Sequence, residues 1–392
     1  MTTVPLHLAV ALDGAGWHPA AWRDPAARPR ELFTARHWAA LVTEAERGLL
    51  DFVTIEDALG LQSTLFDGPD ERVDQVRGRF DAVLLASALA PLTTRIGLVP
   101  TATTTHTEPF HVAIGIATLD HVSNGRAGWR VQLSPRRTEA AHFGHRDIPL
   151  LDPDRVDLDH LANLFDEAAD AVEVARRLWD SWEDDAEIRD VPTGRFVDRD
   201  RLHYIDFTGP RFSVKGPSIT PRPPQGQPIV TVLDHGGSRV PYELPARAAD
   251  IVYVTPHSRA QAAAIVEQVR SVPRDGQPVK VFADLLVFVG DDAAGRKARL
   301  DELAGAELTS DAAVFAGTAD ELAELLLDWQ QAGIEGYRLR PGVVPVDLKA
   351  ITRHLTSALR RHGAFRSAYE AGTLRGLLGL GRPVSRYTAP VA

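Results

Sequence analysis

The chain of 392 residues contains no cysteine. This absence excludes disulfide bonds, thiolate metal sites and cysteine nucleophiles together. No run of about 18 apolar residues is present either, so no segment is expected to span a membrane. The first residues show no basic stretch ahead of an apolar one, which argues against a secretory signal and favours the cytoplasm.

An excess of positive charge is also missing, because 53 acidic residues outnumber 43 basic ones and leave a formal net charge of −10. Proteins that bind nucleic acid usually carry a basic face, so neither nucleic acid nor a membrane is an expected partner. The 14 histidines show no metal-ligand spacing such as His-Glu-x-x-His, and we expect no metal site. An apolar content of 44% is normal for a protein with a full core.

Apolar, β-rich runs alternate with helix-like patterns along the whole chain. Strands are predicted at 6–12, 52–55, 96–99, 128–133, 229–233, 251–254, 281–289 and 336–339. Helices predicted between them include 35–48, 80–90, 158–180, 260–269, 321–332 and 347–361. Eight strands interleaved with helices fit a (β/α)8 TIM barrel. A doubly wound open sheet would give the same alternation, but no glycine-rich dinucleotide fingerprint follows the first strand.

Two segments interrupt this rhythm. Residues 185–227 are rich in Pro, Gly and Arg, and we interpret them as an insertion between strands four and five of a single domain, 1–392. Polar residues 60–78 form a second long loop after strand two. Long ordered loops often act as lids, so both segments are candidates for covering a substrate, with surface decoration as the plain alternative.

The stretch from His106 to Trp129 shows the repeating unit most clearly. A threonine-rich segment and a loop lead into a helical pattern with an apolar face, and a new strand follows the helix. Ser123-Asn124-Gly125 is predicted to end the helix, because Asn and Gly accept the left-handed conformation of a C-cap. The order strand, loop, helix, turn, strand is the unit of parallel α/β folds.

The same stretch resembles a known family. Residues 119–129, Leu-Asp-His-Val-Ser-Asn-Gly-Arg-Ala-Gly-Trp, are similar to the luciferase-like flavin-dependent monooxygenases, in the branch of the nitrilotriacetate, dibenzothiophene-sulfone and pristinamycin-type enzymes. Other similar motifs are Leu-Trp-Asp-Ser-Trp at 178–182, Lys-Gly-Pro at 215–217, Pro-Arg-Pro-Pro-Gln-Gly at 221–226 and Thr-Leu-Arg at 373–375. The resemblance runs in order through nearly the whole chain and implies the barrel.

In a barrel the active site lies at the carboxyl ends of the strands, which shortens the set of polar residues to consider. Asp57 follows strand two, and Ser134 follows strand four. Thr103 and Thr104 follow strand three. The resemblance implies that these residues contact a flavin, with Asp57 and the threonine pair supporting its ring. It implies FMN as the cofactor, with the deazaflavin cofactor F420 as the less favoured alternative.

The loop after strand five is the predicted phosphate site. Gly236-Gly237-Ser238 lets the backbone approach an anion, and the N-terminal amides of a following helix could point at it. The resemblance implies that this loop holds the flavin phosphate, although Pro241 replaces a family glycine and removes an amide donor. We expect Arg239 to restore positive charge there.

Strands two and four depart from the family pattern within the expected pocket. Glu56 stands where the family has alanine, and Leu133 replaces a polar residue expected against the flavin ring. Arg130 and Gln132 replace asparagine and valine. These departures predict an altered flavin pocket or an altered substrate.

Two histidines are predicted to serve the oxygen chemistry. His18 follows strand one and matches a family histidine on the substrate side of the flavin. A histidine titrates in the range that suits acid–base catalysis. His106, close to the helix after strand three, is the second candidate. The alternative for each is a structural role, in hydrogen bonding to backbone or in capping and packing.

The resemblance implies a monooxygenase that takes reduced FMN from a separate flavin reductase and uses O2 to oxygenate a small organic substrate. Two alternatives stay open. One is a non-catalytic or flavin-independent relative, favoured by the departures above, and the other is an F420-dependent dehydrogenase. The family also implies a homodimer or homotetramer, packed through the helices at 110–122 and 80–90.

Overall fold

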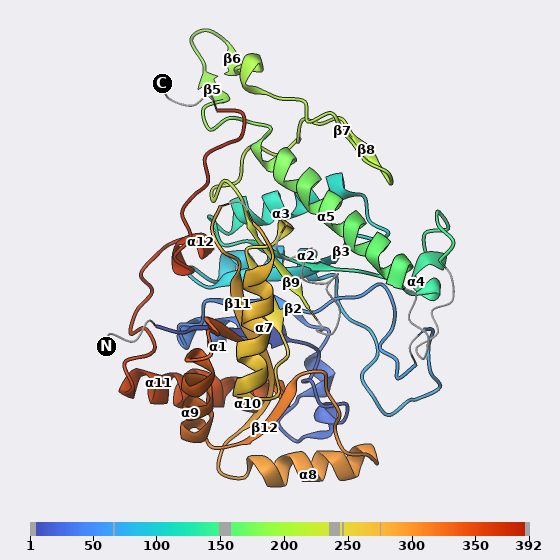
Figure 1. Cartoon of the computed structure of the whole chain (residues 1–392), viewed down its shortest axis with the longest axis vertical. Helices are drawn as coiled ribbons and strands as arrows, with labels where there is room; N and C mark the ends of the chain where they lie inside the picture. The colour runs from blue at the N-terminus through green and yellow to red at the C-terminus, as the bar shows by residue number, and fades with distance from the viewer. Residues whose placement is uncertain are drawn as a thin grey trace.

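Figure 1 shows the computed structural model, which describes residues 5–65, 67–148, 158–234, 244, 247–274 and 276–388. Eight parallel strands close into a barrel in the order β1 (His7–Leu12), β2 (Phe52–Ile55), β3 (Gly97–Thr103), β4 (Gly128–Gln132), β9 (Ile229–Leu233), β10 (Ile251–Val254), β11 (Lys280–Val289) and β13 (Gly336–Pro341). Pairing of β10 with β11 and of β13 with β1 completes the circle. The predicted TIM barrel is confirmed, and β4 and β9 are direct neighbours despite the long segment between them.

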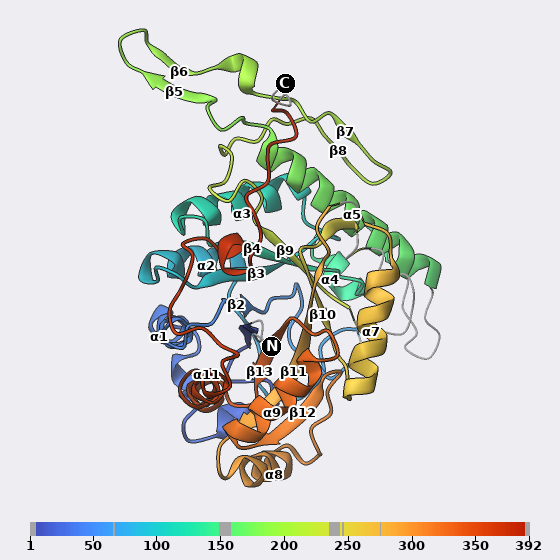
Figure 2. The ribbon, with the colours of Figure 1, turned by 60° about the vertical axis from the view of Figure 1, so that its left-hand side comes forward.

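Helices surround the barrel, as Figure 2 shows from a second direction. They are α1 (Ala35–Arg47), α2 (Ala82–Leu89), α3 (Pro109–Val122), α4 (Arg137–Ala141), α5 (Leu158–Asp180), α7 (Arg259–Ser271), α8 (Ala293–Ala304), α9 (Ala319–Gln330), α10 (Val344–Ala350), α11 (Thr356–Arg361) and α12 (Leu374–Leu377). The end of α3 is as predicted, because Asn124 and Gly125 adopt positive φ angles of 56° and 84°. No helix of the described residues is long and apolar enough to cross a membrane.

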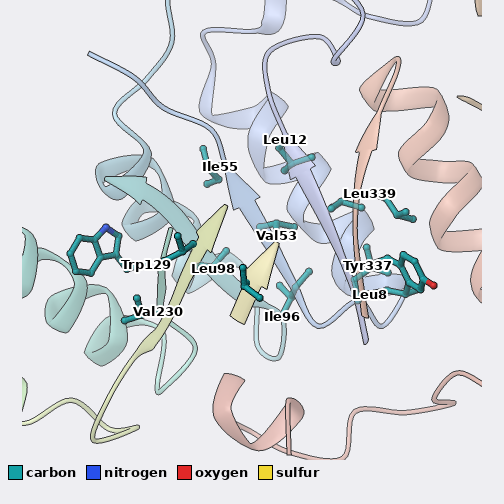
Figure 3. Close-up of a cluster of buried hydrophobic side chains, with 14 of the residues drawn as sticks. Leu8, Leu12, Val53, Ile55, Ile96, Leu98, Trp129, Val230, Tyr337 and Leu339 are labelled. Carbon is teal, nitrogen blue, oxygen red and sulfur yellow. The ribbon is translucent and has the colours of Figure 1, made fainter. Parts of the chain in front are cut away.

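The main core lies between the barrel strands and these helices. Side chains alternate along a strand, so every second residue faces outward to the helices. Figure 3 shows this outward layer, with labelled residues Leu8, Leu12, Val53, Ile55, Ile96, Leu98, Trp129, Val230, Tyr337 and Leu339. The intervening residues face the interior of the barrel, where several of them are charged. That interior layer forms the base of the site described below.

Residues 185–227 lie outside the barrel sheet. Their short strands β5 (Glu187–Asp190) and β6 (Arg195–Val197) form one antiparallel hairpin, and β7 (Phe207–Thr208) and β8 (Ser213–Val214) form another. In Figure 2 both hairpins project beyond α5, away from the barrel. That the two hairpins and the barrel form a single domain, 1–392, stays a prediction.

Three elements differ from the sequence prediction. A short strand, β12 (Ala313–Gly317), was not predicted and adds to β11 as a ninth strand of the sheet. Strand β3 runs on through Pro100 to Thr103, although proline cannot donate to a ladder. The helix predicted at 347–361 is α10 and α11 joined by a π-helical turn, Ile351–Leu355. Its apolar pattern was correct, but a side-chain pattern does not reveal a local change of hydrogen-bond spacing.

Candidate active site

A cavity of about 940 Å³ opens at the carboxyl ends of β1, β2, β4 and β9. This is the end of a TIM barrel at which active sites form. Its volume lies near the top of the range of about 300–1,000 Å³ that is usual for cofactor and substrate sites. The apolar residues of its lining include Leu61, Val131, Leu133, Leu161, Phe165, Val232, Leu233 and Leu244. The polar ones include Asp13, Glu56, Asp57, Arg79, Arg130, Gln132, Arg136, Asp311 and Arg340.

Asp57 is the predicted cofactor residue that lines this cavity. Its carboxylate oxygens accept the backbone N–H of Ala58 at 2.8 Å and that of Ala82 at 2.9 Å. Ala82 is the first residue of α2, so the carboxylate also stabilises the start of that helix. Burial raises the pKa of Asp57. The side chain is therefore held firmly at the edge of the cavity.

Thr103, Thr104 and Ser134 lie at the same end of the barrel, buried, but are not among the residues that line the cavity. The N–H of Thr104 donates to the backbone oxygen of Gln132 at 3.0 Å. Gln132 also reaches Asp57, because its Nε2 donates to the Asp57 backbone oxygen at 3.1 Å. One hydrogen-bonded group thus links the ends of β2, β3 and β4 at the cavity wall.

His106 belongs to this group as well. Its Nε2 donates to the backbone oxygen of Ser134 at 3.1 Å, and its ring stacks on Phe143 with the centroids 5.4 Å apart. Burial lowers the pKa of His106. The ring is not part of the cavity lining. A catalytic role for His106 stays a prediction.

His18 lies in the loop after β1, with only 2% of its surface exposed. Its Nδ1 accepts the backbone N–H of Ala20 at 3.0 Å, so the proton is on Nε2, which donates to Asp301 Oδ1 of α8 at 3.1 Å. Burial lowers the pKa of His18. The ring is not in the cavity lining, although its neighbour Trp17 is. The catalytic role of His18 also stays a prediction.

The predicted phosphate loop, with Gly236, Gly237, Ser238 and Arg239, lies outside the described residues. Many TIM barrels hold a phosphate after the seventh and eighth strands instead. Here that place is taken by the buried carboxylate of Asp347, which accepts the N–H of Val289 at 2.8 Å and that of Val343 at 2.7 Å and pairs with Arg296. These two backbone N–H groups are therefore already bound to a carboxylate.

Three of the departures from the family pattern form one hydrogen-bonded unit at the base of the cavity. Arg130 pairs with Glu56 at 3.2 Å and donates to the side-chain oxygen of Gln132 at 2.7 Å. Burial alone would raise the pKa of Glu56, but Arg130 and Arg338 hold it below its usual value. An arginine inside the barrel needs a carboxylate beside it, so these replacements depend on each other. They do not remove the cavity.

A second ionic group lies deeper, between β11 and β13. Asp284 is fully buried and binds two arginines of the adjacent strand, with its Oδ1 2.8 Å from Arg338 Nε and its Oδ2 2.9 Å from Arg340 Nε. Arg340 continues to Asp311, at 2.6 Å, and its guanidinium lies 4.7 Å from the ring centroid of Trp17. A continuous charged layer thus forms the base of the cavity.

Sequence reasoning did not select these residues, nor Arg79, as part of the site. Two signals were present. Asp284 interrupts an apolar run, and Arg338 and Arg340 occur two residues apart on a strand and so share one face. Nothing in the sequence marks Arg79. Among the described residues, no three acidic or histidine side chains are arranged to hold a metal ion.

The model of one protein family, the luciferase-like monooxygenases, matches residues 15–336. Residues 15–336 make up most of the chain, whose fold and cavity are described above. The chain therefore belongs to the luciferase-like monooxygenase family, and it is an oxidoreductase.

Similar proteins agree with this assignment. N-acetyl-S-(2-succino)cysteine monooxygenase of Bacillus subtilis (strain 168) is 29% identical, over 97% of this chain and 98% of its own. Nitrilotriacetate monooxygenase component A of Aminobacter aminovorans is 28% identical, over 98% of both chains. A riboflavin lyase structure with modified FMN and riboflavin superimposes with a TM-score of 0.81 at 25% identity, covering 98% of both chains. The predicted branch of the family is confirmed.

Proposed function

We propose that the protein is the oxygenase of a two-component monooxygenase that takes reduced FMN from a separate flavin reductase and uses O2 to oxygenate a small organic substrate. The observation that carries this proposal is the cavity at the functional end of the barrel, in a member of this family. Two relatives support it, since one is named component A and the other binds a modified FMN. Neither favours an F420-dependent dehydrogenase or a non-catalytic protein.

The residues around the cavity suit a flavin. An isoalloxazine ring is flat and largely apolar with polar edges, and the lining combines Val131, Leu133 and Val232 with the amide of Gln132. When bound, reduced flavin supplies the electrons that activate O2. The apolar residues of this chain would exclude water from the ring, which protects a reactive oxygen species from loss.

The proposed cofactor contacts follow from this placement. Asp57 would hold the ring edge from the cavity wall, with Thr103, Thr104 and Ser134 supporting the same side from the ends of β3 and β4. The family resemblance implies that the loop at 236–239 holds the phosphate. The occupation of the Val289 and Val343 N–H groups by Asp347 is consistent with this.

Quenching of FMN fluorescence by the purified protein tests the proposal. We expect saturable quenching, and an Asp57→Ala variant should raise the dissociation constant for FMN about tenfold or more, equivalent to about 1.4 kcal/mol. Asp81→Ala is the matched control. Asp81 caps the same helix by accepting the N–H of Leu84 at 2.8 Å, yet it is not part of the cavity lining.

The control separates the two roles of Asp57. If both variants weaken FMN binding equally, Asp57 acts only on the helix. If the protein neither quenches the fluorescence of oxidised FMN nor changes the absorbance spectrum of reduced FMN, the proposed function is wrong and the flavin-independent alternative gains support. Product formation itself is then measured with a flavin reductase, NADH and O2.

A further inference from the structure

Arg79 and Arg136 are the two arginines of the described cavity lining whose side chains make no hydrogen bond within the described protein, and Arg79 is the more buried of them. Its side chain is only 18% exposed, and its Nε is fully buried without a partner. The nearest acidic oxygen is Asp13 Oδ2, at 3.9 Å, which is too far for a hydrogen bond. A guanidinium carries five N–H donors, and buried donors without acceptors are rare and call for an explanation.

Two of the other arginines of the cavity are hydrogen-bonded. Arg130 binds Glu56, and Arg340 binds two carboxylates below the cavity. Arg136 lies 3.7 Å from a carboxylate oxygen of Glu139. Arg79 therefore differs from Arg130 and Arg340 in having no hydrogen-bond acceptor, and from Arg136 in its burial, with 18% of the side chain exposed against 34%.

The backbone around Arg79 is fixed on both sides. Just before it, Gly78 exchanges two hydrogen bonds with the side chain of Gln62, at 2.8 and 3.1 Å. Just after it, α2 begins at Ala82, whose N–H is held by Asp57. A side chain carried on such a rigid frame loses little freedom when it binds a ligand, and this preorganisation favours affinity.

The surroundings indicate which ligand chemistry fits. A guanidinium pairs best with an oxyanion, which it can bind through two parallel N–H donors. Burial raises the pKa of Asp13, although the charge of Arg79 lowers it. At 3.9 Å the two side chains are not in hydrogen-bond contact, which leaves the guanidinium free to bind a closer oxyanion. Leu61, Leu133 and Phe165 supply apolar surface in the same cavity. A ligand with an acidic group and an apolar body would satisfy both features.

We propose that Arg79 binds a carboxylate or similar oxyanion of the organic substrate, so that the substrate class is organic acids with an apolar part. This inference rests on the proposed function, because it assigns the substrate of the same cavity. Arg79 is a specificity-determining residue in this scheme and takes no part in the oxygen chemistry.

The test uses three probes with six-carbon apolar chains and head groups of negative, zero and positive charge. Hexanoate, hexanamide and hexylamine are titrated into the intact protein with excess FMN, and binding is followed by saturation-transfer NMR. We expect hexanoate to bind at least about tenfold more tightly than hexanamide, and hexylamine to bind most weakly. Arg79→Met should remove the preference for hexanoate. Arg79→Lys should keep part of it, because lysine retains the charge without the planar fork.

Arg72→Met is the matched control, since Arg72 belongs to the same loop but pairs with Asp74 at the surface. It should leave the preference unchanged. Equal binding of hexanoate and hexanamide to the unaltered protein overturns the inference, and so does a preference for hexylamine, which would make Asp13 the recognition group. If Arg79→Met weakens FMN rather than hexanoate, Arg79 belongs to the cofactor site and the inference is also wrong.

Failure of the two proposals can be told apart. If the protein shows no preference for hexanoate but quenches FMN normally, only the assignment of Arg79 is wrong. Absence of FMN quenching affects the proposed function, while the preference among the three probes is still measurable without flavin. Should Arg79→Met fail to fold, the probe order in the unaltered protein and in Arg79→Lys still decides the matter.

Discussion

Glu56 and Arg130 illustrate how single residues act in this protein. Each departs from the family pattern. Without Glu56, the Arg130 charge would be unpaired inside the barrel, at a free-energy cost of several kcal/mol. Glu56 also pairs with Arg338, at 3.1 Å. Together Glu56 and Arg130 form an ion pair at 3.2 Å, with Gln132 as a further hydrogen-bond partner of Arg130. These replacements change the polarity of the base of the cavity from that of the family pattern. Arg79 has the opposite character, because its Nε has no partner and its ion pair with Asp13 is 3.9 Å long.

His18 gives a test at the residue scale. We expect His18→Ala to lower the free energy of unfolding by about 1–3 kcal/mol, because both ring nitrogens are hydrogen-bonded in a buried position. Asp301→Asn, which alters the partner on α8, should produce a smaller effect of the same kind. Thermal denaturation of both variants measures this.

A direct catalytic role for His18 predicts a different result. His18→Ala would then keep its melting temperature and FMN affinity but lose product formation about a hundredfold to ten-thousandfold, with leakage of hydrogen peroxide. Parallel measurement of melting temperature and product therefore separates the two roles.

At the scale of elements, β11 and β13 carry the ionic layer under the cavity. Register pairs Asp284 with Arg338 across the two strands, and Arg340 follows on the same face. Burial alone would raise the pKa of Asp284, but Arg338 and Arg340 hold it below its usual value. The carboxylate thus stays charged at neutral pH and fixes two arginines in place. These strands act as a rigid support for the site above.

An Asp284→Asn variant tests this support. It leaves two buried guanidinium groups short of negative charge, and we expect the free energy of unfolding to fall by about 3–5 kcal/mol. Asp311→Asn is the control, because Asp311 pairs with Arg340 from a side chain that is 38% exposed. Its effect should be no more than about 1 kcal/mol. Similar losses from both variants in urea denaturation would contradict a special role for Asp284.

At the scale of the whole molecule, the cavity and the exposed apolar side chains lie on different parts of the barrel. The cavity occupies the carboxyl ends of the strands, whereas α2 and α3 pack together on the outside. This outer region exposes large apolar side chains, with Leu84 at 71%, Leu92 at 56% and Val122 at 45%. Such side chains are common at interfaces between subunits, in keeping with the predicted homodimer or homotetramer.

Light scattering tests the predicted association. We expect a mass of two or four times 42.7 kDa at micromolar concentration, and a Leu84→Glu variant should shift it toward the monomer. Leu65→Glu is the control, since Leu65 is 52% exposed but lies in the loop before α2. A clean monomer for the unaltered protein would contradict the prediction, as would an unchanged mass for Leu84→Glu.

The sequence by itself determined the order of strands and helices, because hydrophobic periodicity and turn residues such as Asn124 and Gly125 act locally along the chain. The family motifs and the strand-end rule then placed Asp57 at the cavity. Only the tertiary structure decided which charged residues meet. Glu56 and Arg130, or Asp284 and Arg340, come from strands far apart in sequence, and their pairing depends on barrel closure and register. For the same reason the unpaired Nε of Arg79 became visible only in the folded chain, where its burial and the lack of an acceptor can be seen together.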